Sequence, residues 1–145
     1  MNGRTIGYWA ATGLVAVAFA AGAAMDLSGN PEILATLGHL GYRPYFAILL
    51  GVWKLLAVIA ILAPRFPRLK EWAYAGIVFD LTGAIVSHLA VGDRVGDVVA
   101  PVVLLGLAAA SWSLRPESRA TRAHETGAAP KSRAHTDELP RVSAA

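Results

Sequence analysis

The sequence predicts an all-α membrane protein, an antiparallel four-helix transmembrane bundle with a short amphipathic helix in its first outer loop. Composition is the first observation behind this prediction: 55% of the residues are hydrophobic and only 16% are charged, whereas average soluble domains are about 25% charged. The second is that the apolar residues gather in four runs, which cover residues 6–25, 45–63, 72–91 and 98–114. A bilayer core about 30 Å thick needs about 17–25 helical residues, so every run can cross it, the last one at the lower limit. Backbone groups in lipid must be paired internally, which makes these runs helices.

The connections between the runs arrange them in space. The second and third runs are joined by a short segment that contains Pro64 and Pro67, so these two helices are expected to be antiparallel neighbours. In the first outer loop, NPEILATLGHLG has Asn30 as a helix N-cap, Pro31 at the first helical position and Gly41 past the end. The apolar residues of this segment share one face: Ile33, Leu34, Leu37 and Leu40. We expect a short helix on the outer surface or capping the bundle, with an ordered loop as the alternative.

The two ends of the chain carry their own signals. Arg4 followed by an apolar run and AFAAGAAM resembles a cleaved signal peptide, but the apolar stretch exceeds the about 7–15 residues of such signals. A membrane helix is therefore the preferred interpretation, and cleavage is the alternative. Residues 115–145 contain no aromatic residue and are rich in small, polar and charged residues, so we expect a disordered cytoplasmic tail. Residues 1–114 then form one four-helix transmembrane domain.

Lysine and arginine are unevenly distributed over the loops, which predicts the orientation. The N-terminal end, the loop after the second run and the tail share one side and contain one, three and six of these residues. The opposite side has only Arg43 and Arg94. By the positive-inside rule, both termini are cytoplasmic. The basic residues form no stripe interleaved with aromatics, so no nucleic-acid partner is expected despite the net charge of +3.

Several kinds of chemistry are excluded or disfavoured by what the sequence lacks. The chain has no cysteine, which removes disulfides, thiolate metal sites, iron–sulfur clusters and thiol redox mechanisms. No nucleophile–base pairing, phosphate-binding loop or metal-ligand spacing is present, so no metal site is predicted. Haem is disfavoured because no second membrane histidine lies at the depth of His88.

Two charged residues, Lys54 and Asp80, lie inside the second and third apolar runs. Lys54 is nine residues from the cytoplasmic end of its run and Asp80 eight residues from the cytoplasmic end of the next. At 1.5 Å per residue both lie about 12–14 Å above that edge. Each also shares a helix face with small residues, which let helices approach closely. An unpaired charge at a helix centre costs about 2.5–3.5 kcal/mol, so we expect Lys54 and Asp80 to form an ion pair inside the bundle.

Such a pair has two interpretations. It can fix the helix register without any ligand, or it can belong to a polar site for a ligand head group or a proton step, because ionisable residues inside membranes are often functional. His88 and Asp26 lie nearer the outer side, and with His39 of the outer helix they could line a pocket open to that side. Asp93 and Asp97 are expected to be solvated loop charges. The candidate ligand-binding residues are therefore Lys54, Asp80, His88 and Asp26.

The stretch from Leu40 to Asp93 resembles the DoxX-like family of small four-helix integral membrane proteins. The motifs that carry the resemblance are GYRPYF, GVWKL, PRFPRLKEWAYAG, FDLTGA and SHLAVGD. The resemblance implies a bacterial plasma membrane and relatives associated with quinone-linked sulfur oxidation or with membrane oxidoreductase assemblies. It supplies no agreed set of catalytic residues, so the sequence leaves open whether the protein is an enzyme.

The leading hypothesis is a quinone- or lipid-binding subunit or accessory of a membrane oxidoreductase. Lys54 would hydrogen-bond a quinone carbonyl, and Asp80 or His88 would manage the proton that accompanies reduction. The expected partners are the lipid bilayer, oxidoreductase subunits and a lipid-soluble small molecule. The alternative is a non-catalytic assembly or structural protein whose Lys–Asp pair only fixes helix register. A solute or proton pathway ranks last, because four short helices leave little room for a pore.

Overall fold

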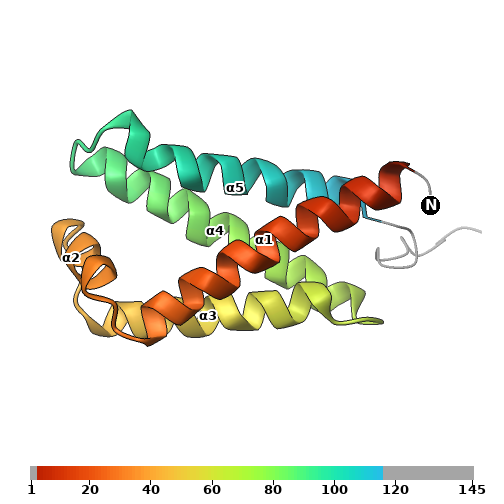
Figure 1. Ribbon diagram of the computed structural model, residues 1–145, viewed down its shortest axis with the longest axis horizontal. Helices are drawn as coiled ribbons and strands as arrows, with labels where there is room; N and C mark the ends of the chain where they lie inside the picture. The colour runs from red at the N-terminus through yellow and green to blue at the C-terminus, as the bar shows by residue number, and fades with distance from the viewer. Residues whose placement is uncertain (1–2, 116–145) are drawn as a thin grey trace, which may run out of the picture.

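The computed structural model describes residues 3–115, and over this range the chain is all-helical without strands. The helices are α1 (Gly3–Leu27), α2 (Pro31–His39), α3 (Tyr45–Leu62), α4 (Pro67–Ala90) and α5 (Val95–Ser113). Helices α1, α3, α4 and α5 are long and apolar enough to cross a membrane. Each of these begins at the end of the molecule where the preceding one finishes (Figure 1). The predicted tail over residues 116–145 lies outside the described residues.

The short helix predicted in the first loop is present as α2. Asn30 caps it, since its side-chain oxygen accepts hydrogen bonds from the backbone N–H groups of Glu32 and Ile33. Pro31 begins the helix, and Gly41 follows it with a φ of 86°, a conformation that glycine adopts without steric cost. Helix α4 begins at Pro67, five residues before the predicted apolar span, because the preceding polar turn is also helical.

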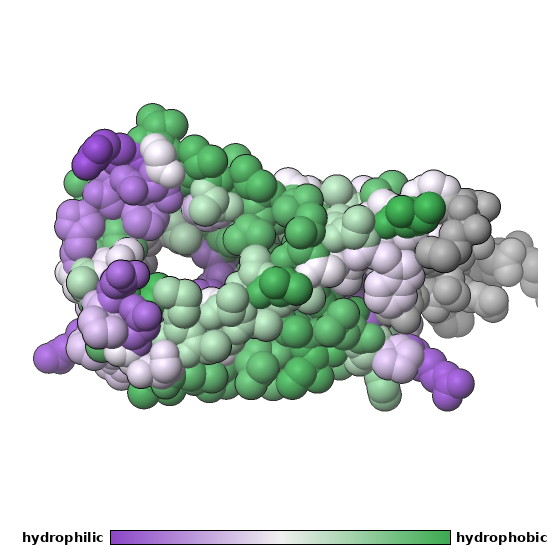
Figure 2. Space-filling view, viewed as in Figure 1, coloured by the Kyte–Doolittle hydropathy of each residue, from purple (hydrophilic) through white to green (hydrophobic). Residues whose placement is uncertain are grey.

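The four long helices form a closed ring in which α1 and α4 each pack against α3 and α5. The core lies toward the α3–α4 loop and consists of Val15, Ala16, Phe19, Ala60, Ile61, Ala73, Tyr74, Ile77, Leu81 and Ala108. Toward α2, the α1–α3 pair and the α4–α5 pair diverge (Figure 1). Figure 2 shows apolar side chains over most of the long helices, hydrophilic ones around α2, and a hollow in the surface beside α2. The bundle is therefore packed at one end and open at the other.

Buried polar contacts join the helices at the packed end of the bundle, toward the α3–α4 loop. The ammonium group of Lys70, which is 1% exposed, donates to the carbonyls of Ala60 and Ile61 at the end of α3. This contact places a positive charge where the α3 carbonyls lack helical partners. Ser111 of α5 hydrogen-bonds to Thr12 of α1 at 2.6 Å and to the Tyr74 hydroxyl of α4 at 2.7 Å. Three helices are thus joined through one hydroxyl.

Arg115 corrects one boundary of the sequence analysis. The predicted disordered tail begins at this residue, but Arg115 is only 7% exposed. Its guanidinium forms an ion pair with Glu71 and lies over the rings of Tyr74 and Trp112. Arginine combines a long apolar stem with a planar charged group, so it can pack on aromatic rings while keeping an ionic partner. Arg115 therefore belongs to the folded bundle.

Candidate functional site

A cavity of about 830 Å³ lies between α3 and α4 and beneath α2. Its wall is mostly apolar, with contributions from α1, α2, α3 and α4. All four candidate residues of the sequence analysis lie on this wall: Asp26, Lys54, Asp80 and His88. The apolar face of α2 closes one end through Ile33, Leu37 and Leu40. The tertiary structure thus brings residues from three membrane-spanning helices to one cavity.

Lys54 forms its ion pair with Asp26 and not with Asp80, which corrects the predicted pairing. The Lys54 Nζ lies 2.8 Å from an Asp26 carboxylate oxygen, and the two side chains are only 20% and 3% exposed. Lys54 and Asp80 were matched by their depth along the helix axes, which leaves out how far the lysine side chain reaches from its backbone. That side chain passes Gly22, where an added Cβ would lie 3.5 Å from the Lys54 Cδ, and reaches the last turn of α1. A lysine stem can cover several ångströms of apolar surface in this way.

Close contact between α1 and α3 makes this pair possible. A Cβ added to Gly51 would lie 2.7 Å from the Leu27 Cγ and 3.0 Å from the Asp26 Cβ, distances at which atoms clash. Only glycine therefore lets the end of α1 rest on α3 at this point. The prediction that small residues share the lysine face of α3 is confirmed, since Ala47 and Gly51 are both buried.

Asp80 has a different environment, although it lies on the same wall. Within residues 3–115 no hydrogen bond or ion pair joins its carboxylate to another group, and it is partly exposed to the cavity. It is still close enough to Lys54 and Asp26 to interact electrostatically with both. The wall therefore presents one compensated ion pair and one further carboxyl group.

Two glycines near Asp80, Gly76 and Gly83, leave space and do not bring helices together. Both line the cavity together with Ala84 and with Ala73, which also packs in the apolar core. A Cβ added to Gly76 or Gly83 would meet no atom within 4 Å. Small residues on one helix face usually allow close helix contact, which is what the stripe around Asp80 was expected to do. Ala73 does pack in the core, whereas Gly76 and Gly83 border the cavity.

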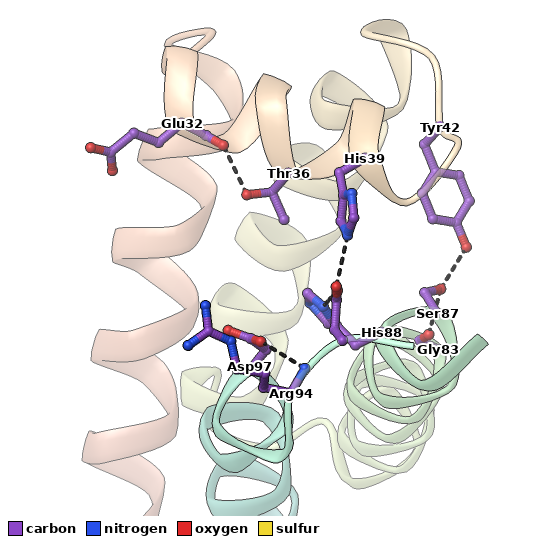
Figure 3. Close-up of polar contacts among 10 residues, drawn as sticks. Glu32, Thr36, His39, Tyr42, Gly83, Ser87, His88, Arg94 and Asp97 are labelled. Atoms are coloured by element: carbon purple, nitrogen blue, oxygen red, sulfur yellow. Dashed lines mark hydrogen bonds and ion pairs between the residues drawn. The ribbon is translucent and has the colours of Figure 1, made fainter. Parts of the chain in front are cut away.

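Two polar contacts hold α2 over the open end of the bundle (Figure 3). Asp93, in the loop between α4 and α5, binds His39 of α2 through one carboxylate oxygen and His88 of α4 through the other, each at 2.7 Å. The Tyr42 hydroxyl lies 2.8 Å from the Ser87 hydroxyl. Both histidine contacts, His39 first, lower the pKa of the Asp93 carboxyl below its usual value of 3.8. We call this arrangement of His39, Asp93 and His88 the cap triad.

The cap triad was not predicted. Asp93 and Asp97 were expected to be solvated loop charges. Asp93 lies in the loop between α4 and α5, but it is also bonded to two histidines. Asp97 lies in the first turn of α5, where it accepts a hydrogen bond from the Arg94 backbone N–H at 3.1 Å. The sequence shows only that His39, His88 and Asp93 each stand at or near the end of a predicted helix. It does not show that these three residues meet, because His39 is far from the other two along the chain.

No set of three His, Asp or Glu side chains that could hold a metal ion occurs in the part of the chain that the structure describes. The cap triad is not such a metal-binding set. The other candidate ligand-binding residues on the cavity wall are one lysine and two carboxyl groups. The chemistry that this wall offers is hydrogen bonding and proton exchange in an apolar space.

Four membrane-spanning helices, three of which line an apolar cavity with a charged wall, define a small multi-pass membrane protein. More narrowly, the chain belongs to the DoxX-like family, whose sequence profile matches residues 10–111. This match confirms the resemblance found in the sequence and covers every residue of the cavity wall and the cap triad. No curated protein and no solved structure matches the chain.

Proposed function

We propose that this protein holds a lipid-soluble small molecule in the cavity beneath α2 and serves as a subunit or accessory of a membrane oxidoreductase. One observation carries the proposal: Asp26, Lys54, Asp80 and His88 converge on a single apolar cavity between membrane-spanning helices. Small-molecule sites typically occupy about 300–1,000 Å³ and combine an apolar lining with a few polar groups. A quinone is the ligand class that we favour, because its ring is apolar and its carbonyls accept hydrogen bonds.

We assign each of these residues a separate role in binding the ligand or exchanging a proton with it. Lys54 has three N–H donors, so it can keep Asp26 as its partner and still donate to a ligand carbonyl. Asp80 has no side-chain partner within residues 3–115 and can exchange a proton with a bound molecule. His88 binds Asp93 through Nδ1, which leaves Nε2 for the cavity.

A specific observation also favours a second candidate function, that of a structural or assembly protein. The Lys54–Asp26 pair joins α1 to α3 where Gly51 allows the two helices to touch, so it can hold the helix register without any ligand. In this case the cavity would be filled by ordinary membrane lipid.

The two functions differ in whether the purified protein retains a specific molecule. We would purify it in mild detergent from its native membranes and identify co-extracted lipids by mass spectrometry. Gly83→Leu fills the cavity, because a Cβ at this position meets no atom. Gly106→Leu, on an exposed position of α5 outside the cavity, is the matched control. A stoichiometric molecule that is lost only in Gly83→Leu supports the proposal, whereas bulk lipid alone in every sample supports the structural alternative.

A further inference from the structure

The charges on the cavity wall restrict the ligand more narrowly than its size does. Lys54 is the one lysine among the wall residues, which include no arginine, and Asp26 compensates its charge at 2.8 Å. Asp80 adds a carboxyl group that interacts with both. An anionic head group would face two carboxyl groups in an apolar space where like charges repel strongly. A cationic ammonium head group could pair with Asp80, but it has no acceptor for the N–H donors of Lys54. A dipolar but uncharged head group meets a donor and an acceptor without this cost.

The opposite half of the cavity has the character of a hydrocarbon channel. Its wall there includes Leu69 and Trp72, which precede Asp80 on α4 by eleven and eight residues, together with small residues of α3 and α4. Trp72 and Phe79 are 79% and 75% exposed, so the wall continues onto the surface that faces lipid. Asp80 and His88 come later on α4, toward the end that α2 covers.

From these two observations we propose that the cavity takes an amphiphile with an uncharged, hydrogen-bonding head group and a long hydrocarbon chain. The head lies between Asp80 and the Lys54–Asp26 pair, and the chain leaves between α3 and α4 into the bilayer. This inference rests on the proposed function and adds to it the charge of the ligand and the route of its chain. It excludes fatty acids and anionic phospholipids as the specific ligand, and it ranks lipophilic amines below uncharged head groups.

The inferred charge of the ligand head group is tested with three probes that share a dodecyl chain: dodecyl-1,4-benzoquinone, dodecyl sulfate and dodecyltrimethylammonium. Each is titrated, well below its micellar concentration, into the full-length protein in phosphatidylcholine nanodiscs, and native mass spectrometry counts the adducts against empty discs. We expect the uncharged probe to bind one per protein and at least about tenfold more tightly than either charged probe, which is about 1.4 kcal/mol. A charged probe that binds as tightly as the quinone overturns the inference.

Asp80 variants test the position of the head group. Asp80→Asn keeps a hydrogen-bonding side chain and should change quinone affinity less than about threefold, whereas Asp80→Leu should weaken it about tenfold or more. Because Asp80 has no side-chain partner within residues 3–115, neither substitution breaks an ion pair of the bundle. Equal affinities for Asp80→Leu and the wild type would contradict the proposed position.

Gly76→Leu tests the route of the chain. A leucine at this position projects into the hydrocarbon half, where no atom lies within 4 Å of the added Cβ. It should weaken the dodecyl quinone about tenfold but leave methyl-1,4-benzoquinone unaffected, and Gly106→Leu should change neither. Equal effects of Gly76→Leu and Gly106→Leu would show that the chain does not lie between α3 and α4.

If no probe binds and native extraction finds only bulk lipid, the proposed function fails, whereas a preference for a charged probe defeats only the present inference.

Discussion

Lys54 shows how a charged residue is accommodated inside a membrane-spanning helix. Its ammonium reaches Asp26 over Gly22, and both charged groups are withdrawn from lipid. Removing one member of a buried pair leaves the other charge uncompensated, which is more costly than removing both. The stability of the bundle should therefore depend on the balance between the two residues more than on either alone.

Substitution of Lys54 and Asp26 makes this balance measurable. Lys54→Met should lower the free energy of unfolding by about 3 kcal/mol, because Asp26 is left buried and ionised or must take up a proton. Adding Asp26→Asn should restore most of the loss. Denaturant titration in mixed micelles measures each variant, with Asp80→Asn as the control that breaks no ion pair and should cost less than about 1 kcal/mol. Additive losses in the double variant would contradict a paired arrangement.

The cap triad predicts how acid acts on α2. The histidines lower the pKa of Asp93 below 3.8, so its ionised form is favoured in the folded protein. The stabilisation is fully present above pH 3.8 and is lost as the pH falls through the lower, folded-state pKa. Amide exchange in α2, corrected for intrinsic rates, should be slow at pH 7 and should accelerate below about pH 3.8.

Asp93→Asn removes the charge at every pH. The amides of α2 in this variant should therefore exchange faster than in the wild type already at pH 7, and their exchange should not accelerate further on acidification. Asp97→Asn is the control, because Asp97 bonds the Arg94 backbone and has no hydrogen bond or ion pair with α2 among residues 3–115. Equal protection of α2 in Asp93→Asn and the wild type at pH 7 would show that the triad does not hold the cap.

At the scale of elements, the same residue type has opposite roles on two helices. Gly51 allows the end of α1 to rest against α3, while Gly76 and Gly83 on α4 border open space. A stripe of small residues therefore indicates either a contact or a cavity, and the neighbouring helix decides which.

Gly51→Ala should destabilise the bundle by about 1–3 kcal/mol, because the new methyl group lies 2.7 Å from Leu27 and 3.0 Å from the Asp26 Cβ. The displaced end of α1 also lengthens the Lys54–Asp26 contact. Gly13→Ala is the matched control: a Cβ there meets nothing, and replacing glycine within a helix should stabilise by about 0.5–1 kcal/mol. Unfolding measurements that give both substitutions the same sign would contradict the close contact of α1 and α3.

At the scale of the whole molecule, the bundle is asymmetric along its length. The end at the α3–α4 loop contains the apolar core and the buried contacts of Lys70 and Ser111. The other end is hollow and covered by α2. We propose that the packed, lysine- and arginine-rich end faces the cytoplasm of a bacterial cell, with both termini on that side and α2 outside.

Cysteine labelling tests this orientation without background, because the chain has no native cysteine. Single variants Glu32→Cys in α2 and Phe66→Cys before α4 place thiols on exposed positions at opposite ends. A membrane-impermeant maleimide should label Glu32→Cys in intact cells and Phe66→Cys only after permeabilisation. The reverse pattern would place α2 in the cytoplasm.

The sequence by itself determined the four apolar helices, the capped helix α2 and the identity of the candidate residues, since hydropathy, capping and charge are local properties that can be read from neighbouring residues. Only the tertiary structure decided that Lys54 pairs with Asp26, that Asp93 holds α2 through two histidines, and that the small residues of α4 line a cavity. These outcomes depend on how closely two helices approach and how far a side chain reaches across the gap. Helical periodicity specifies the direction of a side chain about its own axis, and it contains no information on the distance to the next helix.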